Sequence, residues 1–269
     1  MRFLRRRIDD EPDLPEPPVA DAPGTLPPDV PELPPGRALV SDPDATEVGW
    51  ISDEHWSAWS ELAELFPGSG LWPVLVAPYG GDDRDPLEEL DLELGRGPVA
   101  ETDAAAVLAE LWGVDAEDAD DPDFLEVLAP FGARFPGLAG IRPERRPGGI
   151  GKAVKSMANW SRLALVPVTR GADVPAAIGW SGPVNLTDEV WKLSVVLRSW
   201  EERFGALVVG IGFDTLTLAV RRPPAGDAAL AVAAEHFAFC PDNITQGAGT
   251  MSRYAREIDG AVAWSFWWD

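Results

Sequence analysis

Hydrophobic residues recur at the spacings of helices and strands most clearly in residues 160–269. Thr187 is the expected N-cap of a long helix because acidic residues fill the first turn after it, and Gly205 suits the end of that helix. The apolar stripe of this helix consists of Leu193, Val196, Leu197, Trp200 and Phe204. We expect this stripe to face a buried core.

The rest of this part predicts strands that alternate with helices. Strands are expected at 162–168, 207–211, 215–220 and 263–268, the middle two forming a hairpin. Helices are expected at 173–179, 227–240 and 250–258, with Asp173 and Asp227 capping the first two. The order β-α-α-β-β-α-α-β predicts an α+β domain with a small mixed or antiparallel sheet flanked by helices.

Residues 47–140 predict a smaller α/β region. Its expected elements are a helix at 53–66, a strand at 71–77, a helix at 102–112, a solvated acidic loop at 115–123 and a short helix within 124–138. Asp53 and Thr102 are the expected helix caps. Pro73 favours an edge position or a strand start, because proline cannot donate a ladder hydrogen bond.

Two further segments are expected to connect or flank these regions. Residues 9–36 contain 10 Pro and 8 acidic residues, too little apolar surface to offset the entropy of ordering. We therefore expect residues 1–46 to be a disordered tail. Residues 141–159 are expected to form a linker because Pro and Gly at 147–149 interrupt a basic cluster of Arg142, Arg145, Arg146, Lys152 and Lys155.

The negative charge is concentrated in the first part of the chain. The 269 residues carry a net charge of −23, of which −20 lies in residues 1–159 and −3 in residues 160–269. Nucleic acid and anionic membranes attract basic surfaces, so we expect neither as a partner. The acidic half is expected to serve solubility or to attract a basic protein partner.

Cysteine usage and hydropathy bear on location. Cys240 is the single cysteine, which excludes an intramolecular disulfide. The first residues lack the apolar core of a signal peptide, and no stretch reaches the length of a transmembrane helix. We expect a cytoplasmic protein; the oligomeric state does not follow from the sequence.

Several catalytic signatures are approached but not met. Segment 148–153 is similar to a phosphate loop but lacks its first glycine and its hydroxyl residue. Segment 210–215 leads into a strand, where a dinucleotide site needs a helix N-terminus, and 179–182 is one residue short of a nucleophile elbow. With only His55 and His236, a His-rich metal site is excluded, and no cofactor is expected.

One polar motif, S-W-E-E-R-F-G, occupies residues 199–205. Glu201 and Arg203 are two positions apart on a helix and cannot face each other, so each is expected to pair with another element. In the structural interpretation, Glu201 forms an ion pair and Arg203 binds carbonyls at the helix end. In the functional one, both face a cleft.

A second polar motif, E-H-F-A-F-C-P-D-N, occupies residues 235–243. His236 and Cys240 stand at positions i and i+4, the spacing of a Cys-His nucleophile pair or of two metal ligands, and Glu235 or Asp242 could orient the imidazole. Buried cysteine and histidine in a core are the structural alternative. No second cysteine is present to complete a zinc site, so no metal is expected.

A third motif, G-W-S-G-P-V-N at residues 179–185, adds an aromatic surface and an amide. The candidate binding residues are Trp180, Asn185, Trp200, Arg203, Asp242 and Asn243. The candidate catalytic residues are His236, Cys240, Glu201 and Glu235.

Five motifs in order carry a family resemblance. They are G-W-S-G-P-V-N, L-R-S-W-E-E-R-F-G, R-P-P, A-A-E-H-F-A-F-C-P-D-N and W-S-F-W-W-D. With their spacing they resemble the bacterial domain-of-unknown-function family 4253 over about Arg162 to Asp269. The G-L-W-P-V-L-V and A-P-F-G segments are similar to those that accompany the domain in actinobacterial members. The resemblance implies a fold and a domain boundary, but no activity and no catalytic residues.

Two functions follow as hypotheses. The first is a cytoplasmic, non-catalytic protein-binding module, immunity-like in that it would neutralise a basic protein or toxin. The alternative is a small-molecule hydrolase or transferase that uses His236, Cys240 and Glu201 or Glu235 in one cleft. The direction in which these side chains point distinguishes the two.

Overall fold

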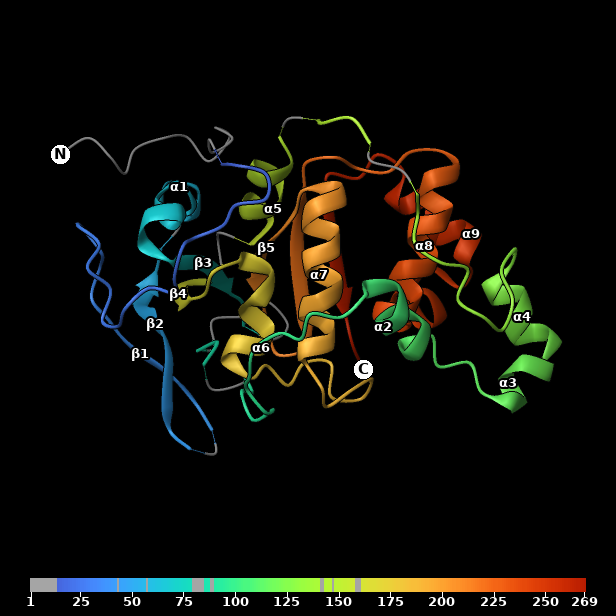
Figure 1. The fold of residues 1–269 in the computed structure, drawn as a ribbon, viewed down its shortest axis with the longest axis horizontal. Coiled ribbons are helices and arrows are strands. Elements are labelled where there is room, and N and C mark those ends of the chain that lie inside the picture. The colour runs from blue at the N-terminus through green and yellow to red at the C-terminus, as the bar shows by residue number, and fades with distance from the viewer. Residues whose placement is uncertain are drawn as a thin grey trace.

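The computed structural model describes residues 14–42, 44–56, 58–78, 85–87, 90–140, 143–146, 148–157 and 161–269 (Figure 1). Parts of the sequence-based predictions lie outside the described residues. They include residues 1–13 and 43 of the expected tail, residue 57 of the expected helix at 53–66, and residues 141–142, 147 and 158–159 of the expected linker.

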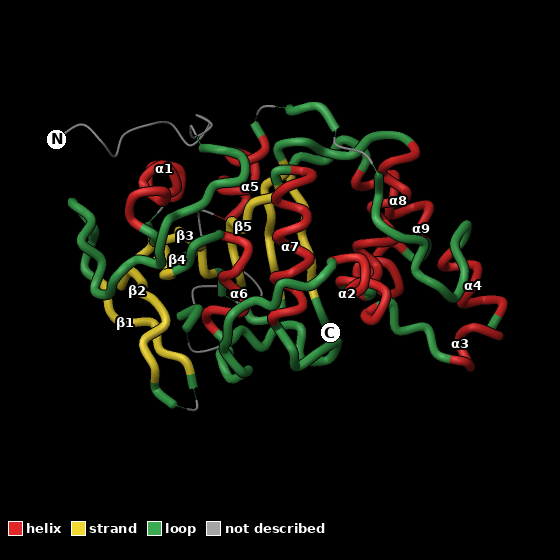
Figure 2. Tube along the Cα trace, in the orientation of Figure 1, coloured by secondary structure: helices red, strands yellow, loops and turns green. Residues whose placement is uncertain are grey.

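A seven-stranded mixed sheet forms the centre of the fold (Figure 2). Its order is β1-β2-β4-β3-β5-β6-β7, and all neighbours are antiparallel except β3 and β5, which are parallel. The strands are β1 (Gly36–Ser41), β2 (Thr46–His55), β3 (Leu71–Val76), β4 (Arg162–Pro167), β5 (Ala206–Ile211), β6 (Thr215–Val220) and β7 (Ala263–Trp267).

The sheet confirms the α+β class but is larger than the small sheet that the sequence predicts. β4, the first strand of the expected C-terminal domain, lies between β2 and β3 of the N-terminal region. β3 in turn separates β4 from β5. The expected boundary at residue 160 therefore crosses a continuous sheet, and strands from both sides of it share backbone hydrogen bonds.

Pro73 lies inside the sheet, so the prediction of an edge position for it is wrong. It pairs with Leu165 of β4, and the amide of Val168 donates to the Gly70 carbonyl at 3.1 Å. Antiparallel hydrogen-bonded pairs alternate, which makes Pro73 and Leu165 a pair without ladder bonds. On the other side, β5 joins β3 only from Leu75 onward. The missing donor of proline therefore interrupts no pairing.

Helices cover the sheet and extend beyond one end of it. They are α1 (Trp59–Ser69), α2 (Ala104–Leu111), α3 (Ala116–Asp120), α4 (Pro122–Leu128), α5 (Gly149–Met157), α6 (Val174–Ile178), α7 (Trp191–Phe204), α8 (Asp227–Phe239) and α9 (Met251–Ile258). Short turns, η2 (Gly171–Asp173) and η3 (Asn243–Ala248), precede α6 and follow α8. Figure 1 shows α7 running along the strands, with α8 and α9 beyond it and α3 and α4 farthest from β1.

The C-terminal part follows the predicted order of elements. Gly205 ends α7 in the left-handed conformation with φ 59°, and the predicted stripe of α7 is buried. The start of this helix differs, because α7 begins at Trp191 and Thr187 accepts a hydrogen bond from the Glu189 amide at 3.1 Å in a preceding turn. Asp173 precedes α6 but does not cap it with its side chain.

The N-terminal helices differ more from the predictions. β2 continues to His55 because it pairs with both β1 and β4, so the expected cap Asp53 lies in a strand. Asp103 rather than Thr102 caps α2, accepting from the Ala105 amide at 3.0 Å. Helix α3 occupies part of the expected acidic loop, started by the Asp115 carboxylate, which accepts from the Asp118 amide at 3.0 Å.

The expected linker and part of the expected tail are ordered in the structure. Residues 149–157 form α5, whose Ile150, Ala153 and Val154 are buried against β5 and β6. Residues 14–35 run over the body of the protein, and their Gly24 amide donates to the Gly70 carbonyl at 2.8 Å before β1 begins.

Candidate functional site

The two polar motifs meet through one buried ion pair. Arg203, near the end of α7, binds both carboxylate oxygens of Glu235 on α8, with Nη1 2.9 Å from Oε1. Glu235 is fully buried and also accepts from Trp200 Nε1 and from the Ala139 amide, each at 2.7 Å. As predicted, Arg203 pairs with another element, and Glu235 holds three chain segments together.

Glu201 lies on the same helix and pairs with a different arginine. Arg170 donates to Glu201 Oε2 from Nε at 2.8 Å and from Nη2 at 2.6 Å, and its Nη1 binds Glu202 at 2.9 Å. Glu201 is buried, and its Oε1 has no hydrogen-bond partner among the described residues. Burial raises the pKa of Glu201 to about 7, because desolvation outweighs the attraction of Arg170.

His236 points into an aromatic core. Its ring lies 4.5 Å from Trp264 and 4.9 Å from both Trp200 and Phe266, and Nδ1 is 3.0 Å from the Tyr254 hydroxyl. The side chain is fully buried, and Nε2 has no partner in the described part of the chain. Burial lowers the pKa of His236 to about 3, with a smaller contribution from the charge of Arg203.

Cys240 ends α8 with its thiol buried. Sγ donates to the Trp267 carbonyl at 2.9 Å and lies 3.4 Å from Asn243 Oδ1. The Asn243 amide nitrogen donates to the Ser265 carbonyl at 2.8 Å and to the Tyr254 hydroxyl at 3.0 Å. Burial raises the pKa of the Cys240 thiol to about 12, so it is protonated near neutral pH. In the described part of the chain, this thiol and the imidazole of His236 hydrogen-bond to different groups.

The remaining candidates also bind other parts of the chain. Trp180 is fully buried and donates from Nε1 to the Gly212 carbonyl at 2.9 Å. Asn185 is exposed, and its side-chain amide donates to the Asp269 carbonyl at 2.8 Å. Asp242 accepts from the Asp269 amide at 3.2 Å. The contacts of Asn185 and Asp242 hold the C-terminal residue Asp269 against two loops.

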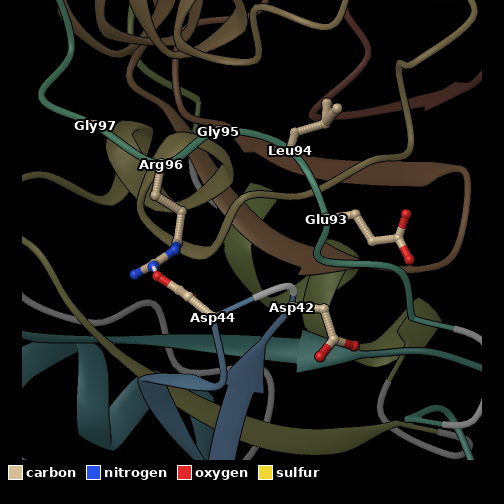
Figure 3. Close-up of a pocket in the computed structure, with 7 residues that line it drawn as sticks. All are labelled: Asp42, Asp44, Glu93, Leu94, Gly95, Arg96 and Gly97. Atoms are coloured by element: carbon tan, nitrogen blue, oxygen red, sulfur yellow. Dashed lines mark hydrogen bonds and ion pairs between the residues drawn. The ribbon is translucent and has the colours of Figure 1, made fainter.

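One surface cavity of about 480 Å³ lies between the β1–β2 turn and residues 93–97 (Figure 3). Arg96 points to the carboxylate of Asp44 and forms an ion pair with it. Asp42 and Glu93 also line the cavity. The cavity is acidic and contains none of the candidate residues named from the sequence.

A second cavity, of about 330 Å³, lies between the start of α2 and the face of α7. Arg198, Ser199 and Glu202 of α7 line one side of it, together with Arg170 from the loop after β4. Arg198 binds the Asp173 carboxylate through Nε at 2.6 Å and Nη2 at 2.8 Å. His236, Cys240 and Glu235 line neither cavity. The described residues include no group of three or more His, Cys, Asp or Glu that could hold a metal ion.

The comparisons with known proteins address the part of the chain that contains this geometry. Residues 162–269 match the family model of the Domain of unknown function (DUF4253). The searches of curated proteins and of solved structures gave no match. The resemblance based on five motifs is thereby confirmed, with the same residue range.

The DUF4253 segment begins with β4 and contains every candidate residue of the two polar motifs. In the sheet, β3, which lies outside the match, is inserted between β4 and β5 of this segment. In the described residues, Ala139, also outside the match, contributes an amide to Glu235. Sequence reasoning did not single out Arg170 or Tyr254, which lie outside the recognised motifs, and it did not predict the ion pair between Arg198 and Asp173.

Proposed function

We propose that this protein acts by binding a basic protein partner, in the cytoplasm, through the acidic surface of α3 and α4. The observation that carries the proposal is a set of exposed or partly exposed acids to which the described residues supply no counter-charge. Among the described residues, no cation pairs with Asp118, Asp120, Asp121, Asp123 or Glu126.

The sequence around these helices supports a binding role for this charge. Residues 97–133 contain ten acidic residues and no lysine or arginine. Glu110 pairs with Lys192 at 2.8 Å, but no cation among the described residues pairs with the five acids named above. The field of those five acids raises the rate at which a basic partner meets this surface. α3 and α4 lie at the end of the molecule farthest from β1 (Figure 1), which makes them accessible to a large partner.

The polar residues of the DUF4253 segment support binding rather than catalysis. A Cys-His nucleophile pair needs a thiolate or a base next to the thiol, and an opening to the substrate. Cys240 is protonated, His236 is neutral near pH 7, and both are fully buried. Glu201, Arg203 and Glu235 are engaged in ion pairs that connect α7 to neighbouring segments. The hydrolase or transferase alternative therefore lacks a specific observation in its favour.

The described helices include none that is long and apolar enough to cross a membrane. The buried single thiol of Cys240 suits a reducing compartment, which supports the cytoplasmic location in the proposal. In the immunity-like form of this proposal, the basic partner is a toxin or enzyme that loses its activity when this module binds it.

The test is affinity purification from cells of the source organism with two variants of equal charge. In the first, the acids Asp118, Asp120, Asp121, Asp123 and Glu126 are changed to Asn or Gln. The second carries the same changes at five exposed acids elsewhere, namely Asp21, Asp29, Glu32, Glu47 and Glu54. Mass spectrometry identifies the proteins that each variant retains.

We expect wild type and the second variant to retain a lysine- or arginine-rich protein that the first variant loses. Raising the salt concentration should release that protein, because exposed charges are screened beyond about 10 Å at 0.1 M salt. Equal retention by the two variants, or no retained basic protein, would overturn the proposal.

A further inference from the structure

Residues 14–20 lie on the folded body in the manner of a bound peptide. The Leu14 side chain is buried, and its carbonyl accepts from Nη1 and Nη2 of Arg221, each at 3.4 Å. Val19 forms an antiparallel bridge with Arg170, and the Ala20 amide donates to the Thr169 carbonyl at 2.9 Å. The segment is thus held at both ends, and its C-terminal end lies beside the residues that follow β4.

Glu16, in the middle of this segment, enters a cluster of arginines. Its Oε1 is 3.4 Å from Arg221 Nη1 and 3.8 Å from Arg145 Nη1, and its Oε2 forms an ion pair with Arg222. Arg221 is 1% exposed and Arg222 is 12% exposed. The Glu16 carboxylate therefore lies against three guanidinium groups, two of which are largely desolvated.

This concentration of positive charge is unusual in a chain with a net charge of −23. The backbone places it, because the Arg146 amide donates to the Arg221 carbonyl at 2.7 Å and so brings residues 143–146 beside the end of β6. Nη1 of Arg222 is buried without a hydrogen-bond partner in the described residues. Desolvated guanidinium groups require an anionic partner, since an unpaired buried charge is costly.

We propose that Arg145, Arg221 and Arg222 form a binding site for an acidic, proline-flanked peptide, which residues 14–20 occupy in cis. The recognition elements are a glutamate between prolines and a leucine two positions before it, as in Leu14-Pro15-Glu16-Pro17. Proline restricts the backbone dihedral φ and so lowers the conformational entropy lost on binding. A partner with such a segment would compete with residues 14–20 for the site.

The cis segment controls access to this site. Because it is part of the same chain, its effective concentration is in the millimolar range for a short connection, and it excludes a trans peptide of similar affinity. Loss of the Glu16 anchor should open the site. This proposal is independent of the binding role proposed for α3 and α4. Those helices contribute no residue to the arginine site and would bind a basic partner.

The experiment measures binding of a fluorescent peptide with the sequence of residues 12–22 to the full chain. We expect the Glu16→Ala variant to bind the peptide at least about tenfold more tightly than wild type does, since a charged hydrogen-bonded contact contributes about 1.5–3 kcal/mol. A peptide with glutamine in place of its Glu16 should bind about tenfold more weakly. Asp21→Ala, which removes an exposed charge from the same segment, is the matched control and should behave as wild type.

No binding to a folded Glu16→Ala variant, or equal binding of the glutamine peptide, would overturn the proposal. Folding is checked on the same samples by circular dichroism and thermal melting. If the variant does not fold, hydrogen exchange of the wild-type protein tests the site instead. An excess of the peptide should accelerate exchange of the Ala20 amide, which is bonded to Thr169 in the cis complex. Unchanged exchange of that amide would also overturn the site.

Discussion

Arg203 on α7 and Glu235 on α8 form a bidentate ion pair that joins the two polar motifs of the C-terminal part, with Nη1 2.9 Å from Oε1. Glu235 has no exposed surface, whereas Arg203 keeps 19% of its side chain accessible. The carboxylate receives further hydrogen bonds from Trp200 and from the Ala139 amide. Donors on two segments, α7 and the loop at Ala139, thus compensate for the desolvation of one buried charge.

Replacing Arg203 by methionine should strongly destabilise the protein. The variant keeps the aliphatic packing but leaves Glu235 buried without its counter-charge. Removing one partner of a buried pair costs about 3–5 kcal/mol of the free energy of unfolding. Urea denaturation followed by tryptophan fluorescence measures this loss.

Arg253→Met is the matched control for that measurement. Arg253 forms an exposed pair with Glu257 at 3.5 Å, and such surface pairs contribute about 1 kcal/mol or less. If Arg203→Met and Arg253→Met lower the free energy of unfolding equally, the buried pair does not have the structural role assigned to it.

Glu201 should make stability fall as the pH rises. Its pKa is about 7 in the folded protein and near 4.5 in the unfolded chain, so the folded state binds the proton more tightly. The favourable contribution of the protonated acid is therefore present below about pH 4.5 and is lost as the pH rises through about 7. The full effect is on the order of 3 kcal/mol.

The comparison of Glu201→Gln with wild type isolates this effect. Glutamine resembles the protonated acid at every pH, so its stability relative to wild type should increase between about pH 4.5 and 7. Glu202→Gln changes the exposed partner of the same Arg170 and should leave the pH dependence of Glu201 in place. A pH-independent difference between Glu201→Gln and wild type would contradict the assignment.

Local pattern was sufficient to predict most elements of the C-terminal part. The stripe of α7, its end at Gly205 and the hairpin of β5 and β6 depend on short-range spacing and turn residues. The same reasoning failed where pairing between distant strands decided the outcome. β2 continues to His55 because β4 pairs with it, and no pattern within residues 46–55 contains that information.

The candidate site was predictable only in part, for the same reason. Helical geometry correctly indicated that Glu201 and Arg203 need partners on other elements. Their partners, Arg170 and Glu235, are 31 and 32 positions away and meet them only through the packing of α7. Likewise, the i, i+4 spacing of His236 and Cys240 could not show that both point into a core built by β7.

His236 should remain neutral throughout the range in which histidine usually titrates. Its pKa is lowered to about 3 by burial, so the folded state binds a proton less readily than the unfolded chain does. The resulting stability is present above about pH 6.5 and is lost as the pH falls toward 3. In a His55→Gln background, the one remaining imidazole can be followed by NMR, and its signal should not shift between pH 5 and 8. A titration midpoint near 6.5 would show that the imidazole is solvated.

Cys240 should be unreactive in the folded protein and reactive after unfolding. The thiol is buried, it donates to the Trp267 carbonyl, and burial raises its pKa to about 12, so both access and thiolate are lacking. Labelling with a disulfide reagent such as DTNB should therefore require an opening of α8 and β7, and be about a thousandfold or more slower than in 6 M guanidinium chloride. The chain has one cysteine, so the release of one thiolate equivalent reports this residue alone, and Cys240→Ala provides the blank. Native labelling at the rate of a free thiol would contradict the buried position and would return Cys240 and His236 to the list of candidate nucleophile and base.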